Sequence, residues 1–266
     1  MNNVRNMLAY KAQRHTDQMN LLYSDNIKRS IDGTIMWEDG VVKDLIHSNR
    51  SNDTKIHVED MCSVTALLET GICDKYSNIA MLNFASYKEP GGRFLEGSSA
   101  QEEALCHESY LYNVLEAFVD DYYTPNHDTL NNGLYKDNLL YVPNIYFSRN
   151  NNGKACDVIV CAAPNKGVAM RYGKVTTTEY MDALHSRIDA ILYTAFTNHV
   201  ECLILGAFGC GVFRNDPMDV ASTFKDLLTG KYAGAFHEVI FPIPQNPKNH
   251  NFSVFNTIFN SPKKGW

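Results

Sequence analysis

The stretch from Leu82 to Tyr112 places an apolar run, a glycine-rich loop and an acidic helix start directly one after another. The run breaks at Pro90-Gly91-Gly92, and Gln101-Glu102-Glu103 then open a helical pattern. Because glycine has no Cβ, a ligand can approach the loop amides closely. The helix dipole favours ionised carboxylates at this helix start, whereas burial in an apolar cleft would keep one protonated.

Successive helical residues project about 100° apart, so the two glutamates need not share a task. One can hold a substrate hydroxyl while the other transfers a proton. A plain turn followed by an acidic helix start fits the spacing equally well, because a lone Gly-Gly or Glu-Glu pair is a weak signal.

A second glycine-rich segment follows the apolar run 201–205 and precedes a helix expected from Pro217 to Leu228. Backbone N–H groups that turn inward beside a helix N-terminus form an anion site suited to a diphosphate. A tight structural loop is the alternative, and no Gly-Lys-Ser/Thr follows that would indicate a P-loop. The segment reads Gly206-Ala207-Phe208-Gly209-Cys210-Gly211-Val212-Phe213.

Apolar runs alternate with helical patterns along the chain, which predicts an α/β fold with a mixed, mostly parallel sheet flanked by helices. Both glycine-rich loops follow strand ends, so we expect them to converge on one ligand crevice. Strands are expected at 34–37, 54–58, 79–84, 157–163, 201–205 and 237–243, and helices at 4–22, 62–69, 178–197 and 217–228.

The remaining segments are predicted to lie outside the core. Residues 1–50 are expected to form a helical extension, and 120–153 a polar loop excursion with short strands at 138–141 and 145–147. We expect a turn at 150–153, a loosely packed tail to Trp266, and Asp60 as a helix N-cap.

Length and composition favour one globular domain of 266 residues, with 44% hydrophobic and 20% charged residues. A net charge of −6 without a basic block argues against sequence-specific nucleic-acid binding, and neither a signal peptide nor an apolar run of membrane length is present. Seven cysteines without a CxxC pair indicate reduced thiols and a cytoplasmic protein. The nine histidines show no metal-ligand spacing, and Cys106 is interpreted as a packed thiol rather than a nucleophile.

The sequence P-G-G-R-F-L-E-G-S-S-A-Q-E-E resembles the signature of bacterial-type poly(ADP-ribose) glycohydrolases of the macrodomain superfamily. Arg93 stands where that signature has its third glycine, so it could narrow the pocket or pair with phosphate. The segment G-A-F-G-C-G-V-F-x-N-D-P is similar to the diphosphate loop of the same family, with Phe208 in place of the usual Trp. The resemblance implies a three-layer, macrodomain-like sandwich.

By this resemblance, Glu103 is the acid and base that cleaves a ribose glycosidic bond through an oxocarbenium-like state, and Glu102 holds ribose hydroxyls. Asn83 either lies near the distal ribose or is only a turn residue. Phe213 packs on ribose or adenine, and either Glu59 or Asp60 lies near the adenine. The expected substrate-binding residues are Asn83, Gly91, Gly92, Arg93, Gln101, Gly206, Phe208, Gly209, Cys210, Gly211, Val212 and Phe213.

The implied partner is poly(ADP-ribose) or an ADP-ribosylated protein, with ADP-ribose as product and no cofactor, metal or membrane. Two alternatives stay open: a mono-ADP-ribosyl hydrolase, and a non-catalytic ADP-ribose reader in which Arg93 obstructs the loop. The two glutamates argue against a reader, which has no use for a proton donor. The oligomeric state is not predicted.

Overall fold

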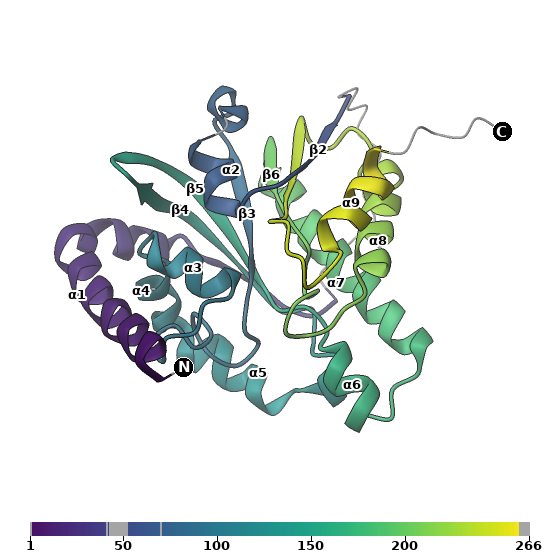
Figure 1. Ribbon diagram of the computed structural model, residues 1–266, viewed down its shortest axis with the longest axis horizontal. Helices are drawn as coiled ribbons and strands as arrows, with labels where there is room; N and C mark the ends of the chain where they lie inside the picture. The colour runs from purple at the N-terminus through teal and green to yellow at the C-terminus, as the bar shows by residue number, and fades with distance from the viewer. Residues whose placement is uncertain (1, 41, 43–52, 70, 261–266) are drawn as a thin grey trace. The chain divides into compact units, whose positions relative to one another are not determined.

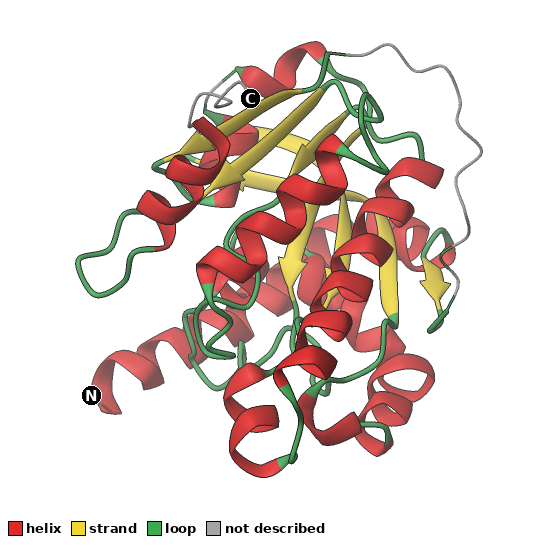
Figure 2. Ribbon diagram, turned by 90° about the vertical axis from the view of Figure 1, so that its right-hand side faces the viewer, coloured by secondary structure: helices red, strands yellow, loops and turns green. Residues whose placement is uncertain are grey.

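The computed structural model describes residues 2–40, 42, 53–69 and 71–260. Within them, seven strands join in the order β1-β4-β5-β3-β6-β7-β2, with parallel and antiparallel pairs. The predicted α/β class with a mixed sheet flanked by helices is therefore confirmed (Figure 2). The strands are β1 (Ile35–Trp37), β2 (Lys55–Glu59), β3 (Ile79–Phe84), β4 (Leu139–Arg149), β5 (Asn152–Cys161), β6 (Cys202–Ile204) and β7 (Glu238–Pro242).

The helices of the described residues range from single turns to long segments (Figure 1). Short 3-10 or π turns add η1 (Ile72–Lys75), η2 (Glu116–Phe118), η3 (Val119–Tyr123) and η4 (Asn131–Gly133). The α-helices are α1 (Asn2–Asp32), α2 (Ser63–Leu68), α3 (Gln101–His107), α4 (Leu111–Leu115), α5 (Thr124–Asp128), α6 (Lys166–Tyr172), α7 (Thr177–Thr197), α8 (Pro217–Thr229) and α9 (Asn251–Asn260).

The chain divides into two compact units. The first unit comprises Met1–Asp39, Leu82–Asn131 and Tyr135–Ala162. The second unit comprises Gly40–Met81, Asn132–Leu134 and Ala163–Trp266. The single catalytic domain that the chain length favours stays a prediction.

In the first unit β4 and β5 form a long antiparallel hairpin, and β1 pairs with β4. The two-residue turn of the β4–β5 hairpin is Asn150-Asn151, with φ of 52° and 65°. Twisted hairpins prefer this left-handed geometry, and asparagine tolerates it. The predicted turn at 150–153 is thus confirmed. Pairing shifts between Val142 and Ile145, where Pro143 has no N–H to donate and Asn144 has a φ of 59°.

Helix α1 packs along α4 and β4 in the same unit (Figure 1). The predicted N-terminal helix is confirmed but runs ten residues further than expected, with a break at Tyr23, where φ is −128° and ψ is 23°. Gly97 explains the close approach of α1 to the loop before α3, because a Cβ there would lie 2.0 Å from the Arg5 carbonyl oxygen.

In the second unit β2, β7 and β6 run parallel, and helix α7 begins as its sequence predicts. Thr176 Oγ1 accepts from the Glu179 N–H at 3.2 Å, and Glu179 Oε2 accepts from the Thr176 N–H at 2.8 Å. This reciprocal capping box fixes the first turn.

The short strands expected at 138–141 and 145–147, within the polar segment 120–153, are confirmed as parts of β4. The expectation that this segment lies outside the core is wrong, because residues 139–142 are buried, and η3 and α5 precede them in place of a loop. The polar residues mislead because they pair with one another: Asn138 Nδ2 donates to Asn126 Oδ1 at 2.8 Å, although within the described residues Asn126 Nδ2 has no partner.

The strand expected at 34–37 is confirmed as β1, so the N-terminal extension is not helical throughout, and residues 43–50 lie outside the described part. Two smaller predictions fail. Asp60 does not cap α2, because its Oδ1 accepts from the Gln245 N–H and Cys62 occupies the N-cap position. The tail is not loose up to Asn260, because α9 packs the fully buried Phe255 against Phe241 of β7.

Phe255→Ala should lower the free energy of unfolding by about 3–5 kcal/mol, because it empties a packed aromatic site. Urea unfolding followed by circular dichroism measures this change. Ser253→Ala, on the exposed side of α9, is the control and should change stability by less than about 0.5 kcal/mol. Equal stability of both variants would contradict the packing of α9.

Candidate active site

Two adjacent glutamates lie buried in the first turn of α3. Glu102 is 3% exposed and Glu103 is 6% exposed. Two neighbouring carboxyl groups are rarely buried unless each has hydrogen-bond partners. Their surroundings within the first unit therefore decide what each can do.

Glu102 is held by the end of β3. Its Oε1 accepts from Asn83 Nδ2 at 3.1 Å, and its Oε2 accepts from the Ser86 N–H at 2.7 Å. Burial raises the pKa of Glu102 to about 8, although these two hydrogen bonds oppose the shift. At neutral pH this carboxyl is therefore mainly protonated and can donate a hydrogen bond.

Glu103 is held by the glycine-rich loop instead. Its Oε1 accepts from the Arg93 N–H at 3.0 Å, and its Oε2 accepts from the Ala100 N–H at 2.9 Å. Ala100 is the N-cap of α3 and has no side-chain acceptor, so the Glu103 carboxylate satisfies an amide of the helix start. Two main-chain amides thereby fix the orientation of the carboxyl group.

Gly91 and Gly92 have φ of 64° and 61°, which side chains rarely adopt. A Cβ on Gly92 would lie 2.8 Å from Glu103 Oε1 and 3.0 Å from Glu102 Oε2. A Cβ on Gly91 would lie 2.7 Å from the Tyr112 ring. The loop thus needs glycine at both positions so that both carboxyl groups fit.

Arg93 does not have a positive φ, so its backbone conformation does not require the third glycine of the motif. Its side chain is 67% exposed and approaches Glu96 Oε2 at 3.8 Å. The Arg93 side chain therefore points to solvent, while its N–H holds Glu103.

Asn83 and Gln101, both predicted to bind substrate, have different surroundings. Asn83 is fully buried, and within the described residues its Oδ1 has no hydrogen-bond partner. Gln101 Oε1 accepts from the Phe84 N–H at 2.9 Å, and its Nε2 donates to the Leu82 carbonyl at 2.9 Å. The Gln101 amide therefore positions α3 against β3, and its contact with substrate stays a prediction.

In the second unit, the loop after β6 turns sharply at Gly206 and Gly209, with φ of 147° and 70°. A Cβ on Gly209 would lie 2.3 Å from Asn215 Nδ2, so this position also requires glycine. The N–H groups of residues 208, 210, 214 and 215 bond within the loop. In the described chain, those of Gly209, Gly211 and Val212 have no protein partner and are available to an anion.

The side chains of this loop differ in exposure. Phe208 is completely buried and its ring packs in the core, and substrate binding by this residue stays a prediction. Val212 is 81% exposed and Phe213 is half-buried. Burial raises the pKa of Cys210 to about 12, and Asp216 and Asp219 add to the shift, so the thiol stays protonated. The pKa of Cys106 is likewise raised by burial, which excludes a thiolate nucleophile there.

Sequence reasoning missed three residues beside these loops. The Ser86 N–H holds Glu102, but a main-chain donor leaves no signal in the sequence. Tyr123 and Asn215 are buried with side-chain polar atoms that have no partner in the described chain. Burial raises the pKa of Tyr123, with Glu102 adding to the shift. The sequence did offer a signal for Asn215, because it directly precedes Asp216, the N-cap of α8.

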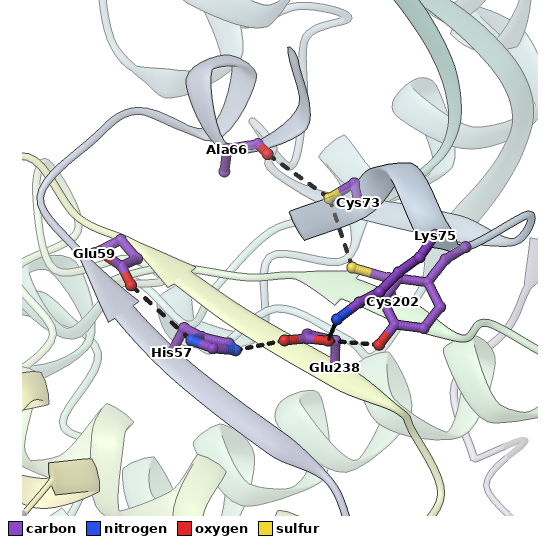
Figure 3. Close-up of polar contacts among 8 residues, drawn as sticks. His57, Glu59, Ala66, Cys73, Lys75, Cys202 and Glu238 are labelled. Atoms are coloured by element: carbon purple, nitrogen blue, oxygen red, sulfur yellow. Dashed lines mark hydrogen bonds and ion pairs between the residues drawn. The ribbon is translucent and has the colours of Figure 1, made fainter. Parts of the chain in front are cut away.

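A third buried glutamate, Glu238, lies at the start of β7 in the second unit (Figure 3). It accepts from Tyr76 and His57 at 2.5 Å each and from Lys75 at 2.9 Å. Burial alone raises its pKa, but these three donors outweigh burial and lower it to about 2. Glu238 and these three donors form a cluster near the start of β7, whereas the loop at 206–213 follows a strand end. Ligands of α/β sheets bind at strand ends, so we interpret the cluster as structural.

In the described residues no group of three or more His, Cys, Asp or Glu side chains could hold a metal ion. Among the same residues, no helix is long and apolar enough to cross a membrane.

Glu102→Gln tests the buried carboxyl. Because folded Glu102 keeps a proton that the unfolded chain releases above its ordinary pKa of 4.5, the free energy of unfolding should fall as pH rises toward 8. The slope attributable to this group is at most about 1.4 kcal/mol per pH unit. Urea unfolding between these pH values should show a shallower slope for Glu102→Gln and an unchanged one for the exposed Glu89→Gln. Equal slopes for all three proteins would refute the raised pKa.

Glu238→Gln should destabilise the protein by about 2 kcal/mol at pH 7, because charged hydrogen bonds are lost. The pKa of Glu238 is lowered, so its stabilisation is fully present above pH 4.5 and disappears as pH falls toward 2. Urea unfolding should therefore show the two proteins converging in acid. Glu59→Gln, at the edge of the cluster, is the control; a constant difference across pH would argue against the ionised cluster.

Comparison with known proteins identifies the family. The family model described as the microbial-type PARG catalytic domain matches residues 4–150. Poly(ADP-ribose) glycohydrolase (PARG) from Deinococcus radiodurans, solved with ADP-ribose, is 33% identical, with a TM-score of 0.79 over 88% of this chain and 97% of that one. PARG from Thermomonospora curvata is 28% identical, with a TM-score of 0.83 over 96% and 100% of the chains.

The T. curvata enzyme bound to the inhibitor ADP-HPD is similar at 27% identity, with a TM-score of 0.82 over the same shares. No curated protein matches the chain. These likenesses confirm the predicted macrodomain-like fold, and the family match covers the β3 end, the glycine-rich loop and α3. The chain belongs to the microbial-type poly(ADP-ribose) glycohydrolase family.

Proposed function

We propose that the protein hydrolyses ribose–ribose bonds of poly(ADP-ribose) and releases ADP-ribose, with Glu103 as the acid and base. The observation that carries this proposal is the buried Glu102–Glu103 pair, whose two carboxyl groups have different partners. Two carboxyl groups in different environments can take different roles in glycoside hydrolysis. Family membership supports the same activity.

Protonated Glu103 gives its proton to the departing ribose oxygen as the bond to the anomeric carbon breaks. The carbon then carries oxocarbenium character, and the Glu103 carboxylate takes a proton from the attacking water, which returns the residue to its starting state. The Arg93 and Ala100 amides hold the group still during both transfers.

Glu102 holds the ribose in this proposal. With its pKa raised to about 8, chiefly by burial, its carboxyl is protonated at neutral pH and donates to a ribose hydroxyl. Asn83, whose Oδ1 has no partner within the described residues, accepts from a second hydroxyl. Gly92 leaves room beside both carboxyl groups for the sugar.

The loop at 206–213 binds the diphosphate. The N–H groups of Gly209, Gly211 and Val212 support this assignment, since main-chain donors ahead of a helix favour an anion. Phe213 packs on ribose or adenine, and Glu59 lies near the adenine. Polymer attached to an ADP-ribosylated protein is a substrate of the same reaction, because its units are joined by the same ribose–ribose bonds. We place the protein in the cytoplasm on its seven cysteines without a CxxC pair.

Glu103→Gln should lower the release of ADP-ribose from automodified poly(ADP-ribosyl)ated protein by at least about 100-fold, because the general acid and base is lost. Thermal stabilisation by ADP-ribose should persist, because Gln can still accept from both amides. Glu89→Gln, exposed in the same loop, is the control and should retain full activity. Unchanged turnover by Glu103→Gln would remove this residue from the mechanism.

A further inference from the structure

A pocket of about 530 Å³ opens in the first unit between α1 and the β4–β5 hairpin. The glutamates of α3 do not line it. The residues that do are three tyrosines, one arginine, two asparagines and one alanine: Tyr23, Tyr110, Tyr146, Arg29, Asn26, Asn144 and Ala155.

The tyrosine rings form an aromatic cluster in which Tyr23 and Tyr146 are half-buried and Tyr110 is only 1% exposed. The centroid of Tyr23 lies 5.5 Å from that of Tyr110 and 5.9 Å from that of Tyr146, at tilts of 37° and 33°. The Tyr110 hydroxyl donates to the Asn144 carbonyl at 2.5 Å, which fixes this ring. Aromatic faces of this kind stack on nucleobases, typically for about 1–3 kcal/mol per base.

Arg29 supplies the charge. Its Nε donates to the Asp25 carbonyl at 3.2 Å, its side chain is exposed, and no carboxylate of the described residues forms an ion pair with it. No Asp or Glu lines the pocket. The guanidinium therefore keeps donors for a planar anion, and phosphate is the anion it fits best.

Two backbone irregularities shape this pocket. Helix α1 breaks at Tyr23, and β4 bulges at Asn144, where φ is 59°. The Asn144 N–H donates to Asp157 Oδ1 at 2.8 Å, so the bulge is anchored on its far side. Strained or broken backbone that the surroundings hold in place is typical of binding sites.

This pocket is separate from the glutamates. Neither Glu102, Glu103 nor the glycine-rich loop lines it. Helix α1 contacts the end of α3 at His15, whose ring lies 6.5 Å from that of His107, and Tyr23 follows eight residues or roughly 12 Å further along α1. A ligand beside Tyr23 and Arg29 therefore occupies a place apart from the one beside Glu103.

We propose that this pocket binds a further ADP-ribose unit of the polymer whose end is being cleaved, an inference that rests on the proposed function. The base stacks on Tyr23 and Tyr146, the asparagine amides bind its edge, and Arg29 binds the diphosphate. The unit is anchored there while another unit of the same chain occupies the site at α3, so long polymers bind more tightly than short ones.

Arg29→Gln tests this with fractionated poly(ADP-ribose). Loss of a charge-assisted hydrogen bond should raise KM for long chains about tenfold and leave kcat unchanged. KM for the shortest cleavable oligomer and thermal stabilisation by ADP-ribose should not change. Arg14→Gln, an exposed arginine on the same helix outside the pocket, should behave as wild type throughout.

The proposal is overturned if Arg29→Gln leaves the long-chain KM unchanged, or raises KM equally for long chains and the shortest oligomer. Equilibrium dialysis with AMP separates the two sources of a nucleotide. If Arg29→Gln abolishes AMP binding but leaves the polymer kinetics normal, the ligand of the pocket is a free nucleotide. This result would also overturn the proposal. Failure of the proposed function is recognised independently, by unchanged turnover of Glu103→Gln.

Discussion

The burial of two adjacent carboxyl groups in one helix turn is the constraint on which the rest of the first unit depends. Each buried carboxyl needs donors, and the chain supplies them from separate segments: the β3 end for Glu102 and the glycine-rich loop for Glu103. The loop can approach closely only because Gly92 has no Cβ. Helix α1 in turn packs on that loop through Arg5 and Gly97.

The different donors also separate the chemistry of the two groups. Burial raises the pKa of Glu102 to about 8, so the residue is a hydrogen-bond donor near neutral pH. Glu103 accepts from two main-chain amides of the loop and the helix start. Adjacent residues of one type thus obtain different roles from the segments that surround them.

Much of this could be predicted from the sequence because it follows short-range rules. Strand runs such as 79–84, the capping of α7 at Thr176 and the glycine turns all depend on neighbouring residues. The acidic helix start was recognisable for the same reason. The convergence of both loops on one ligand stays a prediction, because it depends on contacts between distant segments.

The failures share a physical cause, which is long-range pairing of polar side chains. Asn126 and Asn138 look like loop residues until they bond to each other, and Asp60 looks like a cap until it accepts from Gln245. Gln101 shows the same long-range pairing, because both ends of its amide bond the β3 backbone. A single sequence shows that a residue is polar but not which partner satisfies it.

The net charge of −6 poses a problem for a protein whose substrate is a polyanion. Long-range attraction cannot supply the affinity, because the summed field repels a chain of diphosphates. Binding must then come from local donors without nearby carboxylates.

The described chain offers two sets of such donors. They are the main-chain N–H groups of Gly209, Gly211 and Val212, which have no protein partner, and the guanidinium of Arg29, which forms no ion pair. Main-chain donors bind anions without adding positive charge, so affinity from them depends less on salt than counterion release from a basic surface would. An acidic protein can thus bind poly(ADP-ribose) where diphosphates meet such donors while its remaining surface excludes other polyanions, and this selectivity is what a glycohydrolase of one polymer needs.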